Sequence, residues 1–226
     1  MPSSPPPEPP PRRAIQYLAL GALGLGTCVA LGGVIAITGN GPWGPDAGWL
    51  DYWHDHHTPA LSALSLWFNG AGSRLYLGYI LPAVIAVVLF LKRRPLAAAA
   101  FLVAGLIDYP AVNLLKSAVL RPRPPHPDIN VSLTAYPSGH VANLVVLLAL
   151  VGFALTPRHR RWWWPVAVIL AVTMAFSRTY LDAHWLTDTV GGILFGWGLA
   201  AVLWAVVLRL ERLIRTKSSR TAIKTR

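Results

Sequence analysis

Long apolar segments, separated by short clusters of charged residues and prolines, dominate the pattern of this chain. Residues 14–38 contain no charged side chain, and a helix needs about 20 mainly apolar residues to span a bilayer. Five further apolar segments follow, at 75–91, 96–115, 141–155, 162–176 and 189–208. The pattern predicts an all-α integral membrane bundle of six transmembrane helices. Several segments are short for a bilayer, so we expect these helices to extend into the polar residues beside them.

Both ends of the chain depart from the apolar pattern. Residues 1–13 contain seven prolines and almost no apolar side chains, which predicts a disordered, proline-rich tail. Residues 209–226 form a basic tail, and 14–208 are left as one membrane domain. A signal peptide is the alternative for the first apolar segment. That segment is too long for a signal-peptide core, and no convincing cleavage site follows it, so we expect a retained helix.

The composition supports a membrane protein and excludes a water-soluble globule. Of the 226 residues, 54% are hydrophobic and only 13% are charged, whereas a soluble domain carries roughly 25% charged residues. The single cysteine, Cys28, excludes an intrachain disulfide framework and a thiolate metal cluster. We expect Cys28 to be a small packing residue. Four glycines predict close helix packing in the last span: Gly191, Gly192, Gly196 and Gly198.

The net charge of +11 is explained by membrane orientation rather than by a nucleic-acid partner. If both ends of the chain are cytoplasmic, 15 of the 20 basic residues fall in cytoplasmic segments, as the positive-inside rule requires. Tryptophans 162–164 lie beside one of these clusters, which is typical of a membrane interface. The other basic residues lie on the outer side: Arg74, Lys116, Arg121, Arg123 and Arg178.

Two outer connections concentrate polar side chains that orientation does not require. One joins the third and fourth predicted helices, and the other joins the fifth and sixth. The candidate site residues in them are Lys116, Arg123, Ser138, Gly139, His140, Arg178, His184 and Asp188. Because both connections face the same side of the membrane, we expect their side chains to form one site.

The cations and the Ser138-Gly139 turn have the chemistry of a phosphate pocket. Lysine and arginine bind phosphate, arginine in bidentate fashion. Ser138 and Gly139 directly precede a predicted helix, whose free N–H groups and dipole favour an anion. Glycine also lets the backbone approach a ligand closely. Such a pocket requires no metal ion.

The histidines and Asp188 add the chemistry of phosphoryl transfer. His184 and Asp188 are four residues apart, so on a helix they share one face. A carboxylate that accepts from one imidazole nitrogen leaves the other nitrogen free to attack. His140 is then available to protonate a leaving oxygen and to deprotonate water. These residues predict phosphoryl transfer through a histidine nucleophile.

Three sequence blocks resemble the signature of the type 2 phosphatidic acid phosphatase superfamily, which also includes vanadium haloperoxidases. That signature reads K-x6-R-P, then P-S-G-H, then S-R-x5-H-x3-D. Here the blocks are Lys116 to Pro124, Pro137 to His140, and Ser177 to Asp188, with every fixed position present. The resemblance covers about residues 74–208 and agrees with six membrane helices.

The resemblance implies roles for the individual residues. His184 resembles the nucleophile that forms a phosphohistidine, Asp188 its orienting carboxylate, and His140 the general acid and base. The phosphate clamp is implied to consist of Lys116, Arg123, Arg178, Ser138 and Gly139. The family also implies activity without a metal or other cofactor.

The expected function is that of a lipid phosphatase whose active site faces the outside of the plasma membrane. Undecaprenyl diphosphate is the favoured substrate, and phosphatidylglycerophosphate and phosphatidate are the alternatives, since the motif specifies the phosphate and not the tail. The expected partners are a lipid substrate and the bilayer; no oligomeric state is predicted. A transporter with a proton relay through Asp108, a vanadate-dependent haloperoxidase and an inactive scaffold are the competing functions. The complete motifs and the six predicted spans argue against them.

The sequence also predicts the environment of several residues outside the motifs. Asp108 lies inside a predicted span, where it either supports the site or is satisfied by a neighbouring helix. Arg121, Asp182 and His126 are expected to be solvated. Residues 39–74 predict an amphipathic surface helix with tryptophans among lipid headgroups. The cluster His54-Asp55-His56-His57 lacks the spacing of a metal site.

Overall fold

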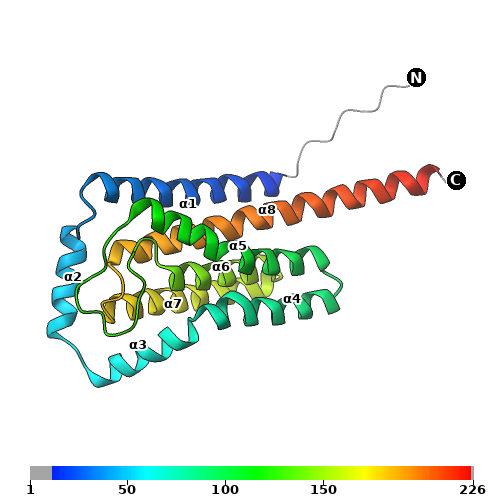
Figure 1. Cartoon of the computed structure of the whole chain (residues 1–226). Coiled ribbons are helices and arrows are strands. Elements are labelled where there is room, and N and C mark those ends of the chain that lie inside the picture. The colour runs from blue at the N-terminus through cyan, green and yellow to red at the C-terminus, as the bar shows by residue number, and fades with distance from the viewer. Residues whose placement is uncertain (1–11, 225–226) are drawn as a thin grey trace.

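The computed structural model describes residues 12–224, and these form a helical bundle with short connections (Figure 1). The helices are α1 (Arg12–Ile37), α2 (Gly44–Asp55), α3 (Pro59–Ala71), the π-helix η1 (Arg74–Ile80), α4 (Leu81–Leu91), α5 (Pro95–Val119), α6 (Gly139–Ala154), α7 (Pro157–Tyr180) and α8 (Leu186–Lys224). No strand occurs within this part of the chain, which confirms the all-α prediction. The predicted tail over 1–13 lies outside the described residues, except for Arg12 and Arg13, which begin α1.

The helix ends follow local sequence signals. Pro59, Pro95 and Pro157 each occupy the first turn of a helix, where a missing N–H costs no intrahelical hydrogen bond. As expected, several helices extend into the polar motifs: α5 contains Lys116, and α6 begins at Gly139. The basic segment after residue 208 continues α8 without a break.

Four helical segments are long and apolar enough to cross a membrane. They are Arg12–Ile37, Pro59–Leu91, Pro95–Val119 and Leu186–Lys217. The second is longer than predicted because α3, η1 and α4 follow one another closely. α6 is a shorter apolar helix. α7 begins with a run of basic residues and contains a proline, Pro165, within the helix. The protein is therefore a multi-pass membrane protein, while the count of six spans and the cytoplasmic ends remain predictions.

Residues 39–74 are not the single surface helix that was predicted. They contain α2, which lies across one end of the bundle (Figure 1), and α3, which belongs to the second span. Trp49 Nε1 donates to Thr179 Oγ1 at 2.9 Å, and the Trp53 ring lies 4.9 Å from that of Phe176. The prediction was wrong for these two tryptophans, because the end of α7 offers them an aromatic surface within the protein.

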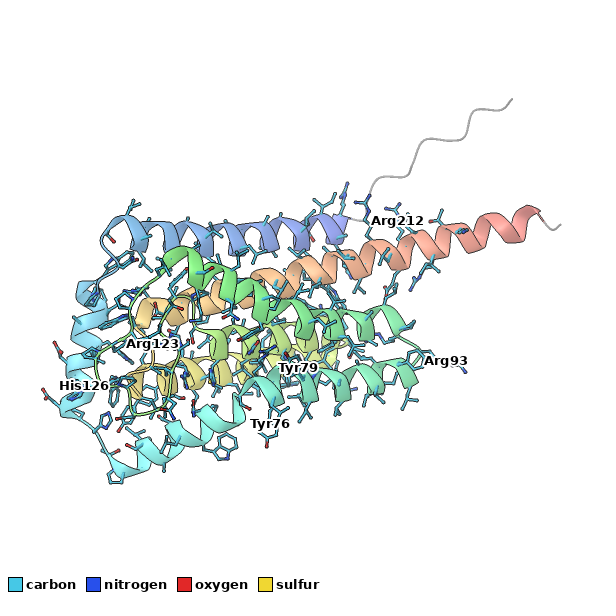
Figure 2. The ribbon with its side chains drawn as sticks, viewed as in Figure 1. Tyr76, Tyr79, Arg93, Arg123, His126 and Arg212 are labelled. Atoms are coloured by element: carbon cyan, nitrogen blue, oxygen red, sulfur yellow. The ribbon has the colours of Figure 1, made fainter. Side chains whose placement is uncertain are left out.

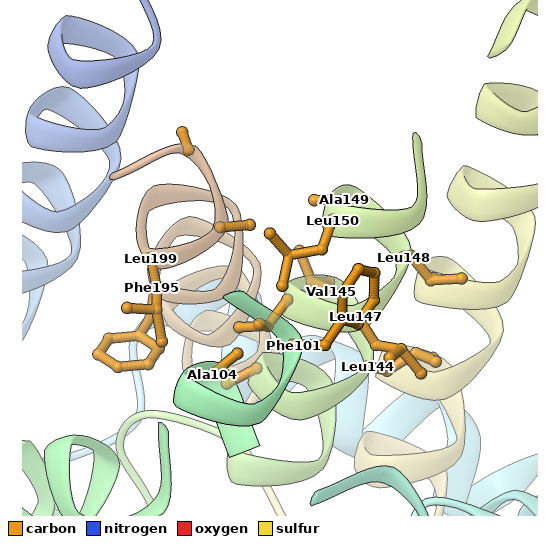
Figure 3. Close-up of a cluster of buried hydrophobic side chains, with 14 of the residues drawn as sticks. Phe101, Ala104, Leu144, Val145, Leu147, Leu148, Ala149, Leu150, Phe195 and Leu199 are labelled. Atoms are coloured by element: carbon orange, nitrogen blue, oxygen red, sulfur yellow. The ribbon is translucent and has the colours of Figure 1, made fainter. Parts of the chain in front are cut away.

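α6 lies at the centre of the core. Figure 3 shows its side chains from Leu144 to Leu150 grouped with Phe101 and Ala104 of α5 and with Phe195 and Leu199 of α8. All of these side chains are buried. Because α6 is surrounded by other helices, its sequence between Val141 and Leu150 is apolar on nearly every face rather than along one stripe.

Glycines allow α8 to approach two other helices closely, as predicted. A Cβ atom added to Gly196 would lie 2.6 Å from the carbonyl oxygen of Ala142 in α6. One added to Gly198 would lie 2.8 Å from the backbone nitrogen of Leu25 in α1. Such contacts are shorter than van der Waals packing permits, so a side chain at either position would force the helices apart.

We expect Gly196→Ala to lower the thermal unfolding temperature, because the added methyl group has no space between α8 and α6. Overpacking of this kind costs about 1–3 kcal/mol. Gly26→Ala in α1 is the matched control, since nothing lies within 4 Å of its added Cβ atom. Thermal unfolding of both variants in detergent would test this, and equal stabilities would contradict the close α6–α8 contact.

Candidate active site

The three sequence blocks meet at the end of the bundle that α2 covers. Figure 2 shows Arg123 and His126 at this end, and Arg93 and Arg212 at the opposite end. A cavity of ≈ 300 Å³ opens here. Six of the eight predicted site residues line it: Lys116, Arg123, Gly139, His140, Arg178 and His184. The other two, Ser138 and Asp188, are buried.

Backbone and amide oxygens hold the three predicted clamp cations in place. Lys116 Nζ, at the end of α5, donates to the carbonyl oxygens of Thr134 and Ala135 at 2.9 and 2.8 Å. Arg123 donates to the Ser132 hydroxyl at 3.0 Å and to the Ser132 and Ala183 carbonyl oxygens. These contacts position the cations through neutral oxygen atoms rather than through carboxylates.

Arg178 completes the set of cations from the end of α7. Its guanidinium donates to Asn69 Oδ1 of α3 and is buried. The Arg178 carbonyl oxygen accepts from the backbone N–H of His184 at 3.1 Å. One residue therefore links the cation cluster to the turn that carries the histidine.

His184 lies in the turn between α7 and α8 and is only 3% exposed. Its Nε2 is 3.1 Å from Arg123 Nη1, and its Nδ1 is 3.4 Å from Asp188 Oδ2. Nδ1 thus lies near Asp188 but makes no hydrogen bond among the described residues, and His184 precedes the helix rather than lying on its face. Burial and the positive charges of Arg123 and Lys116 lower the pKa of His184 well below 6.5. The imidazole is therefore neutral at pH 7, and its Nε2 faces Arg123.

Two hydrogen-bond donors fix the Asp188 carboxylate. Its Oδ2 accepts from the backbone N–H of Trp185 at 2.9 Å, which caps the first turn of α8. Its Oδ1 accepts from Arg121 Nη1 at 2.7 Å. The carboxylate is fully buried, and its orientation is determined from two sides.

Arg121 is buried and ion-paired, so the prediction that it is solvated was wrong. Its Nη2 donates to Asp46 Oδ2 at 2.7 Å, and its Nη1 donates to Asp188 and to Thr187 Oγ1. Asp46 Oδ1 also accepts from the Thr187 backbone N–H at 2.8 Å. Arg121 and Asp46 thus connect the loop after α5, the start of α2 and the start of α8. Sequence reasoning missed this connection, because Asp46 lies 75 residues before its partner.

The Ser138-Gly139 turn has the geometry that the sequence suggested. Ser138 precedes α6, and its backbone N–H donates to the Asp188 carbonyl oxygen at 3.0 Å. Its buried hydroxyl has no hydrogen-bond partner among the described residues. Gly139 lines the cavity, and a Cβ atom there would meet only Val112, at 3.7 Å. This glycine therefore leaves space beside the cavity and makes no close helix contact.

Further polar residues line the cavity outside the motifs. They are Asn69, Arg74, Tyr109, Asn113, Asn130, Ser132 and Asn143. The Arg74 guanidinium lies 3.4 Å from the centre of the Tyr109 ring and donates to the Tyr79 hydroxyl, which restricts its motion. Arg74 could have been suspected from the sequence, since membrane orientation does not require its charge. Asn69 is a lone amide in an apolar helix, a comparable but weaker signal.

Four further residues with predicted environments lie outside the motifs. Asp182 is buried, with Oδ2 at 3.4 Å from His54 Nδ1, so the expectation of a solvated side chain was wrong. His126 is exposed, as expected. Cys28 is a buried packing residue whose carbonyl oxygen accepts from Tyr136. Asp108 is buried, and neither carboxyl oxygen has a hydrogen-bond partner within residues 12–224.

Fold and site together define a multi-pass helical membrane protein with a buried histidine–carboxylate pair among clustered cations. Its sequence matches the PAP2 superfamily over residues 96–212. That match covers more than half of the chain, so this protein belongs to the PAP2 superfamily.

Curated relatives resemble the chain over shorter stretches. It is 30% identical over 91 residues to phosphatidylglycerophosphatase B of Bacillus subtilis. The matched stretch covers 37% of this chain and 45% of the relative. It is 39% identical over 62 residues to an undecaprenyl-diphosphatase of Sulfolobus acidocaldarius, covering 27% and 28%. A decaprenylphosphoryl-5-phosphoribose phosphatase of Mycobacterium tuberculosis is 28% identical over 138 residues, covering 58% and 72%. The first two matches thus span less than half of each relative.

One solved structure has a similar fold. The crystal structure of a PAP2-type phosphatidylglycerolphosphate phosphatase from B. subtilis superposes with a TM-score of 0.72 at 21% identity. The match covers 82% of this chain and 94% of the other. It extends well beyond the region of the family match and shows that the membrane fold is shared.

We expect Arg121→Met to destabilise the protein by about 3–5 kcal/mol, because it leaves two buried carboxylates without their cation. Adding Asp46→Asn should restore part of this loss, because it removes one of the stranded charges. Arg158→Met, at an exposed position beginning α7, is the control and should change the stability by less than about 0.5 kcal/mol. Chemical unfolding in mixed micelles measures the stability of the single variant, the double variant and the control. A loss no larger than that of the control would contradict the buried ion pairs.

Proposed function

We propose that this protein is an integral membrane lipid phosphatase that acts through a phosphohistidine on His184. The observation that carries the proposal is the position of His184, neutral and buried between Arg123 and Asp188 beside the cationic cavity. A neutral imidazole with one nitrogen directed at a carboxylate presents the other nitrogen as a nucleophile.

In the first step, His184 Nε2 attacks the substrate phosphorus, and the bond from phosphorus to the leaving oxygen breaks. His140 donates a proton to that oxygen, and Asp188 stabilises the imidazolium that forms. In the second step, the water oxygen attacks phosphorus, His140 accepts a proton from that water, and the bond from phosphorus to His184 Nε2 breaks. Inorganic phosphate leaves, and His184 is again neutral.

The charge that develops on the phosphoryl oxygens needs fixed positive partners. Lys116, Arg123 and Arg178 are the proposed clamp, because each is held by oxygen atoms near the cavity. Ser138 and Gly139 would add a hydroxyl group and free backbone N–H groups at the start of α6. No metal ion or cofactor takes part in the proposed reaction.

The distribution of basic residues between the two ends of the bundle supports an outward-facing active site in the plasma membrane. The basic turn at 92–94 lies at the end opposite to the cavity, together with Arg13 and Arg160. Under the positive-inside rule that end is cytoplasmic. We therefore place both ends of the chain in the cytoplasm and the cavity on the extracytoplasmic face, with six membrane spans.

Undecaprenyl diphosphate is the proposed substrate. The names of the S. acidocaldarius and M. tuberculosis relatives both contain a polyprenyl group, and Arg74 supplies a further cation at the cavity for a second phosphate. Phosphatidylglycerophosphate is the second candidate, because the B. subtilis relative is named for it. Phosphatidate would use the same clamp. A transporter or a haloperoxidase gains no support from this cavity.

We expect His184→Ala to abolish phosphate release, and Asp188→Asn to reduce kcat by about two to four orders of magnitude while the lipid still binds. The assay uses detergent-purified protein, chelator, and each of the three lipids. Glu211→Gln, at the far end of the bundle, is a control that should retain activity. Full activity of His184→Ala would overturn the nucleophile assignment, and a strict requirement for Mg²⁺ would contradict the metal-independent reaction.

We also expect Arg74→Gln to reduce kcat/KM more for undecaprenyl diphosphate than for its monophosphate, by about tenfold. The physical reason is the loss of one charge-assisted hydrogen bond to the second phosphate. Arg93→Gln in the distant turn is the matched control. Equal losses on both substrates would show that Arg74 does not recognise a second phosphate.

A further inference from the structure

A second, larger cavity lies at the end of the bundle opposite to the catalytic cavity. Its volume is ≈ 820 Å³, and α1, α6, α7 and α8 contribute to its walls. The two cavities share no lining residue. This end carries Arg93 and Arg212 in Figure 2, and the start of α1 and the later turns of α8 in Figure 1.

Three arginines make one part of this cavity cationic: Arg13, Arg94 and Arg160. Arg94 Nη1 donates to the Ala154 carbonyl oxygen at 2.6 Å, and Arg160 Nη2 donates to that of Leu155 at 2.8 Å. These contacts hold both guanidinium groups at the end of α6 while using few of their five donors. Arg160 Nε is buried and has no hydrogen-bond partner among the described residues. Glu211 is the single acidic lining residue, so the cations prevail.

Aromatic side chains form a second part of the wall. Phe153 lies 5.3 Å from Trp197 and 5.8 Å from Trp164, ring centre to ring centre. Trp204 also lines the cavity. In α8 the wall extends from Trp197 to Glu211, fourteen residues or about 21 Å along the helix. The cavity is therefore lined by cationic and by aromatic side chains together.

We propose that this cavity binds one anionic phospholipid from the leaflet at this end of the bundle. The lipid phosphate would lie among Arg13, Arg94 and Arg160, and an acyl chain would follow the tryptophan wall. Arginines between transmembrane helices bind lipid phosphates by charge-assisted hydrogen bonds. A soluble anion would leave the apolar wall uncovered, and a zwitterionic lipid would not match the excess of positive charge. This inference does not depend on the proposed catalytic activity.

Native mass spectrometry of the full chain in detergent would test the proposal, with phosphatidylglycerol and phosphatidylethanolamine as probes. We expect one phosphatidylglycerol molecule to be retained more strongly than phosphatidylethanolamine. Arg13→Gln should weaken its retention about fivefold, the effect of one basic residue near a membrane surface. Arg13 is the preferred position, because Arg94 and Arg160 also hold carbonyl oxygens of α6 and their substitution affects folding.

Two control variants make the result decisive. Arg93→Gln removes an exposed charge at the same end without touching the cavity, and it should leave retention unchanged. Arg123→Gln removes a cation of the catalytic cavity and should also have no effect. An equal loss with Arg93→Gln would show diffuse surface attraction instead of a site, and a loss with Arg123→Gln would place the lipid in the catalytic cavity. Equal retention of the two lipids, or no effect of Arg13→Gln, would also overturn the proposal.

Discussion

The buried ion pairs of Arg121 organise the polar end of this protein. One guanidinium joins Asp46 at the start of α2 to Asp188 in the first turn of α8, both at 2.7 Å. The interaction anchors α2 over the end of the bundle and determines the orientation of the carboxylate that faces His184. Because all three groups are removed from solvent, each depends on the others, and the loss of one leaves an uncompensated charge. The structure of the candidate site therefore depends on residues that do not line its cavity.

The membrane imposes a second constraint, which explains where the site lies. Apolar helices satisfy their own backbone hydrogen bonds, and polar residues are costly between them. The candidate site residues accordingly occur at helix ends and in turns: Lys116 lies in the last turn of α5, Gly139 begins α6, and His184 lies between α7 and α8. At these positions carbonyl oxygens are available to hold the cations, and free N–H groups are available to an anion. Close glycine contacts between α8 and its neighbours bring these ends together.

The positive charges of the chain serve two ends of the bundle in different ways. At one end the cations surround a histidine–carboxylate pair in a cavity of ≈ 300 Å³. At the other, arginines combine with tryptophans around a cavity of ≈ 820 Å³. The first combination suits the transfer of a phosphoryl group and the second suits the retention of a lipid phosphate. Under the proposed orientation, the positive-inside rule accounts for the number of arginines at the second end, and the proposed lipid site rests on their arrangement beside an aromatic wall.

Local patterns in the sequence were sufficient to predict the helical class, the approximate position of most apolar helices, although not of α3, and eight residues that cluster at one end. Hydropathy, proline positions and motif spacing are properties of short segments, so they can be recognised without knowledge of the fold. The burial of Arg121, the packing of Trp49 and Trp53 on α7 and the contribution of Asn69 and Arg74 to the cavity are different. Each depends on which distant segment lies opposite: Asp46 and Asp188 are 75 and 67 residues from Arg121. Whether a charge is solvated or buried is decided by such partners, and only the tertiary structure supplies them.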